Sequence, residues 1–246
     1  MDKMLYIAMG GARQLMQAQA INSHNLANVN TTGFKADLQA FQGLALQGQG
    51  QPSRVYTVDQ GMGADLAPGA QATTGRDLDV ALRGPGFIAV QAPDGAEAYT
   101  RAGDLRLNAN GLLQTSAGHL VLGENGPIAV PPASKLEIGT DGTISIVPLG
   151  QNPNTMTTID RIRLVNPAAN RLSKDVDGLL RLPAGEKVEP DANVQLATGV
   201  LESSNVSATG ALVDMIQLAR QYEMQVKVMK TAEDNDAAAT QLIRLT

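Results

Sequence analysis

The chain has 246 residues, of which 43% are hydrophobic and only 3% are aromatic, and its formal net charge at pH 7 is −5. Because binding to a nucleic-acid backbone needs a basic face, this acidic balance argues against nucleic acid as the main partner. The chain has no cysteine, which excludes disulfides and thiolate metal sites. No apolar run approaches the roughly 18 residues that span a bilayer, so we expect no transmembrane segment.

The first 33 residues are predicted to form an amphipathic helix and its exit turn. One face carries apolar or small side chains at helical spacing. These are Leu5, Met9, Ala12, Met16 and Leu26. Gly10 and Gly11 each weaken the helix by about 1 kcal/mol relative to alanine, so it needs packing partners to form. The segment after Lys3 resembles a weak signal peptide, but the periodic pattern continues past any cleavage point, and we expect a retained helix.

Residues 201–246 are predicted to form a second, longer helix. Its apolar residues alternate between spacings of three and four, the pattern of a coiled coil. They are Leu212, Met215, Ala219, Tyr222, Val226 and Met229. A helix from Ser207 to Leu245 would be about 58 Å long, too long to be covered by the N-terminal helix alone. Part of the stripe is therefore expected to meet other chains, although an ordinary intramolecular core is the alternative.

The central part, residues 75–200, is predicted to be an irregular antiparallel β domain. Short apolar runs alternate there with turn dipeptides such as Asn110-Gly111 and Asp141-Gly142. The expected strands are 78–82, 87–90, 105–107, 112–113, 120–122, 128–130, 136–138, 144–147, 159–165, 179–182 and 194–196. Residues 34–74, rich in Gly and Gln around Gln47–Pro52, are either a flexible connector or an arm ordered by neighbouring subunits. The predicted class is α+β, with the terminal helices pairing as a coiled coil.

No complete catalytic or metal-binding constellation is present in the sequence. Asp77 and Asp79 could share a strand face, but no histidine or further acidic cluster completes a mechanism, so solvated or turn-capping roles are favoured. Gly84-Pro85-Gly86 precedes a strand-like run instead of the helix that a dinucleotide loop requires. The histidines, His24 and His119, have no second ligand at suitable spacing. We therefore predict a protein that is not an enzyme and needs no cofactor, metal or small-molecule substrate.

Five segments together resemble the rod and hook family of bacterial flagellar axial proteins. They are Asn25–Lys35, Gly75–Leu82, Tyr99–Asp104, Asp141–Ser145 and Gly199–Val206. The residues taken as the motif positions at the two chain ends are Asn25, Leu26, Ala27, Asn28, Gly33, Phe34, Ser204, Asn205 and Val206. Within the family, the opening Tyr6–Ala12 and the block Pro52–Tyr56 are most similar to proximal-rod members, and distal-rod members are the runner-up.

The resemblance implies a structural subunit of the flagellar rod, the drive shaft that passes torque across the periplasm. It implies export through the flagellar type III apparatus, self-association and contact with other rod proteins, with terminal helices that pair inside the tube. Distal-rod or hook-type membership is the alternative within the family. A secreted β-rich enzyme or carbohydrate-binding protein is the alternative of a different class, and a surface adhesin is a weaker third.

Overall fold

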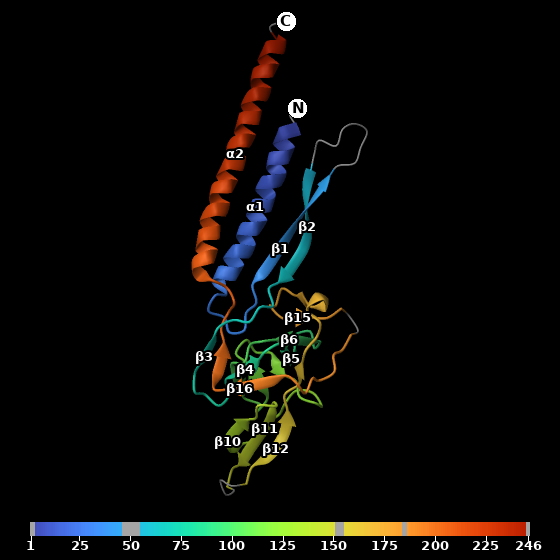
Figure 1. The fold of residues 1–246 in the computed structure, drawn as a ribbon, viewed down its shortest axis with the longest axis vertical. Coiled ribbons are helices and arrows are strands. Elements are labelled where there is room, and N and C mark those ends of the chain that lie inside the picture. The colour runs from blue at the N-terminus through green and yellow to red at the C-terminus, as the bar shows by residue number, and fades with distance from the viewer. Residues whose placement is uncertain (1–2, 46–54, 151–154, 184–185, 245–246) are drawn as a thin grey trace. The chain divides into compact units, whose positions relative to one another are not determined.

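The computed structural model describes residues 3–45, 55–150, 155–183 and 186–244 (Figure 1). The chain divides into two compact units, each assembled from segments that are distant in sequence. The helical unit comprises residues 1–27, 37–63 and 206–246, and the β unit comprises residues 28–36 and 64–205. A helix near each end of the chain and antiparallel strands between them confirm the predicted α+β class.

The helical unit consists of two long helices and a two-stranded sheet. The helices are α1 (Lys3–Ala27) and α2 (Ala208–Arg244), and the strands β1 (Asp37–Ala45) and β2 (Val55–Ala64) pair with one another. These strands fall in the segment for which the sequence predicted a connector or an arm, and its Gln47–Pro52 part lies outside the described residues. No helix in the described ranges is both long enough and apolar enough to cross a membrane.

Helices α1 and α2 lie side by side and run in opposite directions (Figure 1). The Nδ2 of Asn22 donates a hydrogen bond to the carbonyl oxygen of Ala211 at 2.7 Å. Further along the pair, the Gln225 side chain lies 3.3 Å from the position that a Cβ on Gly11 would occupy. The glycine that weakens α1 as an isolated helix therefore leaves the space in which this side chain packs. Ser207 caps the start of α2, because its Oγ accepts a hydrogen bond from the backbone N–H of Gly210.

The β unit is built from short strands that all pair in antiparallel fashion. Their bounds are β3 (Gln71–Thr73), β4 (Val80–Arg83), β5 (Phe87–Gln91), β6 (Glu97–Thr100), β7 (Leu105–Leu107), β8 (Leu113–Thr115), β9 (Leu120–Val121), β10 (Ala133–Ile138), β11 (Thr143–Pro148), β12 (Thr157–Arg161), β13 (Leu164–Val165), β14 (Ser173–Lys174), β15 (Leu180–Arg181), β16 (Gln195–Thr198) and β17 (Val200–Glu202). The main sheet has the order β14-β15-β6-β5-β9-β8-β7, with β13 added on β5, and smaller sheets are β10-β11-β12, β16-β4 and β17-β3.

Most of the predicted apolar runs coincide with strands, and the exceptions have local causes. The run 128–130 is not a continuous strand: it holds an isolated bridge from Ala129 to Leu112, next to another between Pro127 and Leu122. Proline has no N–H to donate, which limits the ladder at that point. The run 159–165 is divided between β12 and β13, which belong to different sheets. Strands β3, β6, β14 and β17 were not predicted, because each has only two to four residues, too few to show an alternating pattern.

The core of the β unit is aliphatic, as the scarcity of aromatic residues requires. Val80, Leu82, Ile88, Leu105 and Ile144 are among its fully buried members. A smaller second cluster gathers around the buried aromatic residues Phe87 and Tyr99, with contributions from neighbouring strands. Its buried members are Phe87, Ala89, Tyr99, Val165 and Leu180. Two faces of β5 thus supply two cores, because successive side chains along a strand point to opposite sides of a sheet.

Candidate assembly interface

The predicted helix-pairing residues occupy both the inside and the outside of the α1–α2 pair. Ala12 is buried, and five others are half-buried: Leu26, Met215, Ala219, Tyr222 and Met229. The remaining five residues of the prediction are exposed. They are Leu5, Met9, Met16, Leu212 and Val226. The single chain therefore covers only part of the stripe that the sequence analysis identified.

The inner face of the pair follows a track of α2 residues spaced alternately by four and three. Its buried or half-buried members are Ala211, Met215, Leu218, Tyr222, Gln225, Met229 and Ala232. Small side chains dominate on the facing side of α1, where Ala8 and Ala12 are buried. A groove between the helices is lined by Gly11, Gln14, Leu15, Ala18, Leu218, Gln221, Met224 and Gln225. The inner face thus combines small residues of α1 with larger, half-buried apolar residues of α2, and further large apolar side chains remain exposed.

Large hydrophobic side chains on both helices of the helical unit are exposed to solvent, and together they are here called the exposed apolar face. Its members are Leu5, Tyr6, Ile7, Met9 and Met16 on α1, and Leu212, Val213, Ile216, Met224 and Val226 on α2. Single exposed apolar residues are common, but a concentration of ten on two adjacent helices is typical of an interaction surface. Burial of such area contributes about 25 cal/mol per Å².

Motif residues at the end of α1 close the connection between that helix and β1. The side chain of Asn25 makes two hydrogen bonds with the backbone of Asp37: its Nδ2 donates to the carbonyl oxygen at 3.0 Å, and its Oδ1 accepts from the N–H at 2.8 Å. The Asp37 carboxylate in turn lies 2.6 Å from Nδ1 of His24, which is exposed. Within the following turn, Oδ1 of Asn28 accepts a hydrogen bond from the Thr31 hydroxyl. Ala27, the last residue of α1, is exposed.

Gly33 and Phe34 have structural roles inside the β unit. Gly33 has a φ of +66°, and a Cβ on it would lie 2.3 Å from the backbone nitrogen of Ala102, so no other residue fits without displacement of the backbone. Its N–H donates a hydrogen bond to the carbonyl oxygen of Glu202 at 2.8 Å. The Phe34 ring is buried, and the Lys174 ammonium lies 3.8 Å from its centroid.

The second motif meets the first within the β unit through Asn205. The Nδ2 of Asn205 donates to the carbonyl oxygen of Asp65 at 2.9 Å, and its Oδ1 accepts from the N–H of Ala36 at 2.8 Å. Ser204 is buried beside it, and Val206, the first residue of the returning helical segment, is half-buried. One side chain thus ties together chain segments that are about 140 residues or more apart.

A buried charge cluster lies next to these contacts and consists of Lys35, Arg101 and Glu202. The Glu202 carboxylate accepts from Nζ of Lys35 at 2.7 Å and from Nε of Arg101 at 2.8 Å, and its exposed fraction is 0%. It also accepts from the N–H of Gly69 at 3.0 Å. Nζ of Lys35 also donates to the carbonyl oxygen of Ala67 at 2.7 Å.

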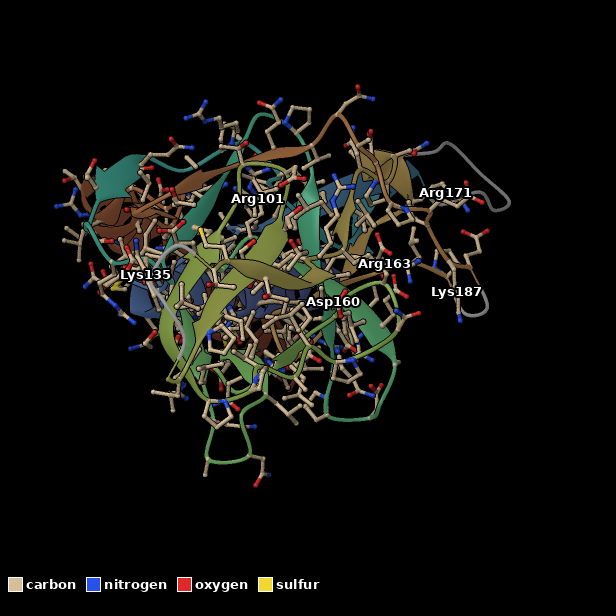
Figure 2. All side chains as sticks on the ribbon, turned by 90° about the horizontal axis from the view of Figure 1, so that it is seen from below. Arg101, Lys135, Asp160, Arg163, Arg171 and Lys187 are labelled. Atoms are coloured by element: carbon tan, nitrogen blue, oxygen red, sulfur yellow. The ribbon has the colours of Figure 1, made fainter. Side chains whose placement is uncertain are left out.

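The guanidinium of Arg101 completes the cluster and contacts the glycine-rich turn Gly84-Pro85-Gly86. It donates to the carbonyl oxygens of Gly86 at 3.0 Å and Gly84 at 3.1 Å. In Figure 2, Arg101 lies among the strands, whereas Arg171 and Lys187 lie towards the edge. The glycine turn therefore supplies carbonyl acceptors to a buried arginine and does not form a nucleotide loop.

All three cluster residues lie inside motifs of the sequence, but their contact was not predicted. One signal was present in the sequence. Lys35, Arg101 and Glu202 are charged residues in three separate motifs, and a charged side chain is seldom buried without a partner. The separation along the chain concealed the pairing, because Lys35 and Glu202 are 167 positions apart.

Burial and charge pairing shift the pKa values of two members of the cluster. For Lys35, desolvation by burial outweighs the hydrogen bond to Glu202 and lowers the pKa from its ordinary value of 10.5. For Glu202, burial raises the pKa, but the hydrogen bonds from Arg101 and Lys35 together outweigh it, so the pKa lies below the ordinary 4.5. The cluster therefore holds Glu202 as a carboxylate.

The lowered pKa of Glu202 predicts acid sensitivity of the β unit. The unfolded chain takes up this proton at about pH 4.5, before the folded chain does, so the contribution of Glu202 to stability is present above that pH. It is lost as the pH falls through the lower, folded-state pKa. Urea unfolding of the full chain should therefore show a stability advantage over Glu202→Gln at about pH 6 that shrinks towards about pH 3. A difference that stays constant over this range would contradict the assignment.

The candidate catalytic groups do not assemble into a site. Asp77 is exposed, whereas Asp79 is buried and accepts a hydrogen bond from the Thr74 hydroxyl at 2.6 Å. Such a contact fits the turn-capping role. Among the described residues, no group of three or more His, Asp or Glu side chains is arranged to hold a metal ion.

Family models match the chain at both ends and in the middle. One described as "Flagella basal body rod protein" matches residues 5–35. One described as "Flagellar hook protein FlgE/F/G D1 domain" matches residues 81–146, and one described as "Flagellar basal body rod FlgEFG protein C-terminal" matches residues 197–242. The two terminal matches include most of α1 and α2, and the central match lies in the β unit.

Curated relatives are similar over the full length of the chain. The flagellar basal-body rod protein FlgF of Salmonella typhimurium is 41% identical over 251 residues, with all of both chains covered. The protein of the same name from Caulobacter vibrioides is 34% identical, with 98% of each chain covered. The flagellar basal-body rod protein FlgG of Buchnera aphidicola is 33% identical, with 89% of this chain and 92% of the relative covered.

Proposed function

The chain belongs to the flagellar basal-body rod protein family, and we propose that it assembles into the rod through the exposed apolar face of its terminal helices. It is a structural subunit of the basal-body rod and not an enzyme, as the sequence predicted. The predicted resemblance to the flagellar rod family is confirmed by relatives named FlgF that match over the full length.

The observation that carries the proposal is the distribution of apolar side chains on the helical unit. Large residues such as Met9, Met16 and Ile216 are exposed, and the residues of α1 that are buried include the small Ala8 and Ala12. In the monomer these exposed side chains contribute no burial free energy. A rod subunit gains this burial free energy on assembly, when helices of neighbouring subunits cover the exposed apolar face.

We propose that α1 and α2 pair as a coiled coil inside the assembled rod. The alternating spacing of the inner α2 track supports this pairing. So does the difference in helix length: α2 has 37 residues and is about 55 Å long, whereas α1 has 25 residues and is about 37 Å long. The part of α2 beyond α1 needs another partner, which subunits of the rod would supply.

The position in the rod and the route to it are further parts of the proposal. The 41% identity to FlgF of Salmonella typhimurium over all of both chains, against 33% to FlgG of Buchnera aphidicola over 89% of this chain, supports the proximal rod over the distal rod. By the family resemblance, the subunit would cross the inner membrane through the flagellar type III export apparatus without a cleaved signal and transmit torque in the periplasm.

The proposal predicts that Val226→Asp prevents rod assembly while leaving the folded chain intact. Val226 is 42% exposed, so an aspartate there costs little in the monomer but places an unpaired charge in the proposed interface. Cells carrying this variant should be non-motile, and isolated basal bodies should lack the chain. Amide hydrogen exchange of the β unit should be unchanged.

Val176→Asp is the matched control, because it makes the same substitution at a valine of the β unit that is 99% exposed. It should assemble normally. Normal assembly of Val226→Asp would refute the role of the exposed apolar face, and so would an equal loss of rod assembly in both variants.

A further inference from the structure

Two carboxylates face each other in the β unit, where the residue before β4 lies beside the residue before β7. Asp79 and Asp104 form an isolated antiparallel bridge there. The backbone hydrogen bonds on either side join their neighbours, so the two residues form a non-hydrogen-bonded pair, the closely spaced kind. In such a pair the Cα atoms are about 4.5 Å apart and both side chains lie on the same face. The two carboxyl groups therefore occupy one small region.

Each carboxylate of the pair has one oxygen that accepts a hydrogen bond and one that does not. Oδ2 of Asp79 accepts from the Thr74 hydroxyl at 2.6 Å, and Oδ2 of Asp104 accepts from the Ser116 hydroxyl. The Oδ1 atoms of both residues are buried and accept no hydrogen bond. Only four buried side-chain atoms of the described residues lack a partner, and two of them belong to this pair. A buried oxygen in this state is costly unless a water or an ion satisfies it.

The nearest cation does not neutralise the pair. Nη1 of Arg76 lies 3.5 Å from Oδ1 of Asp79, beyond the usual range for an N–H···O hydrogen bond. The Arg76 side chain is 62% exposed and that of Asp79 only 1%, so the contact is weak and can be exchanged for a contact with another cation. Arg106 follows Asp104 by two residues, but its Nη2 donates to the carbonyl oxygen of Ser116 at 2.5 Å.

We propose that Asp79 and Asp104 bind a Ca²⁺ ion between their Oδ1 atoms. Calcium takes oxygen ligands in irregular geometry, whereas magnesium demands a near-ideal octahedron. Thr74 and Ser116, which flank the pair, are exposed, so water can complete the coordination. This departs from the expectation that no metal is bound, because the two ligands come from separate motifs that only the fold brings together. The inference is independent of the proposed function, since all these residues lie in the β unit.

The affinity of such a site is expected to be low. Among the described residues, no group of three or more acidic or histidine side chains is arranged around a metal position, so the protein supplies only two charged ligands. Calcium sites of extracellular modules have dissociation constants of about 0.1–1 mM, and we expect this range here. A proton shared between the carboxylates is the other way to satisfy both oxygens, and it predicts no effect of calcium.

Calcium binding to the full chain tests the proposal directly. Equilibrium dialysis against radioactive Ca²⁺ at about pH 7 and about 0.15 M NaCl should show one ion bound per chain, with half-saturation at about 0.1–1 mM. Calcium at about ten times the half-saturating concentration should raise the thermal unfolding midpoint by about 3–5 °C. No binding up to about 10 mM would overturn the proposal and leave the shared proton as the explanation.

Two asparagine variants show whether the bound ion is held by this pair. Asp104→Asn keeps the volume of the side chain but removes one charged ligand, so the affinity for calcium should fall about tenfold or more. Asp77→Asn is the matched control, because Asp77 is an exposed carboxylate two positions from Asp79. Its calcium affinity should equal that of the parent chain. Unchanged binding in Asp104→Asn, or an equal loss in both variants, would overturn the assignment.

Arg76→Gln provides a gain-of-affinity readout that does not depend on a change inside the protein. The exposed guanidinium competes with the ion for Oδ1 of Asp79, so its removal should tighten calcium binding about two- to fivefold. A purely structural contact between Arg76 and Asp79 predicts no such gain. Unchanged or weaker binding would therefore contradict a calcium ion at this position. None of these outcomes bears on rod assembly, which Val226→Asp tests separately.

Discussion

Glu202→Ala is expected to destabilise the β unit by about 3–5 kcal/mol, because it leaves two buried cations without their counter-ion. Lys35 and Arg101 are 3% and 4% exposed, so water cannot replace the lost carboxylate. The Gly69 N–H also loses its acceptor. Urea unfolding of the full chain, followed by circular dichroism, should show the loss as a lower midpoint with a similar slope.

Two further variants show whether the loss of unfolding free energy comes from the unpaired buried charges. Glu233→Ala removes a carboxylate from an exposed position and should change the free energy of unfolding by less than about 0.5 kcal/mol. A combined Lys35→Met, Arg101→Met, Glu202→Leu variant should recover much of the stability, since apolar residues of similar size often replace buried ion clusters without loss. If Glu202→Ala were as stable as Glu233→Ala, the cluster would have no structural importance.

The fold was predictable where local pattern decides it. The apolar period of 3.6 identified α1 and α2, and turn dipeptides such as Asn110-Gly111 separated the strands of the β unit. Strands β3 and β17 could not be predicted in this way. They pair with one another across more than 120 residues, and the residues of β3 are all exposed, so neither burial nor periodicity marks them.

The sequence predicted the apolar residues of the candidate interface, but not which of them are buried between α1 and α2 and which are exposed. Sequence spacing places Met9, Ala12 and Met16 on one stripe, yet only Ala12 is buried in the chain. An apolar stripe reports a tendency to be covered and does not say by which helix. The buried charge cluster could not be predicted from the sequence, for a different reason. Pairing of Lys35 with Glu202 depends on the tertiary path of the chain, which no local pattern encodes.

Gly33→Ala is expected to be the most disruptive single-methyl substitution in the first motif. Its φ of +66° costs an L-residue about 1–2 kcal/mol. The added Cβ would also lie 2.3 Å from the backbone of Arg101 and Ala102, and backbone atoms cannot rotate away as a flexible side chain can. Displacement of that strand connection would disturb the guanidinium held by Glu202. A total loss of about 3–5 kcal/mol of unfolding free energy is expected.

Gly75→Ala isolates the steric part of this effect. Gly75 has a similar φ of +73°, but nothing lies within 4 Å of the position of its Cβ. This control should therefore lose only the conformational cost, about 1–2 kcal/mol. Urea unfolding of both full-length variants measures the difference, and equal losses would show that the close approach at Gly33 relaxes without cost. A larger loss at Gly33 would show that this glycine is required because the chain passes directly against the Arg101–Ala102 backbone.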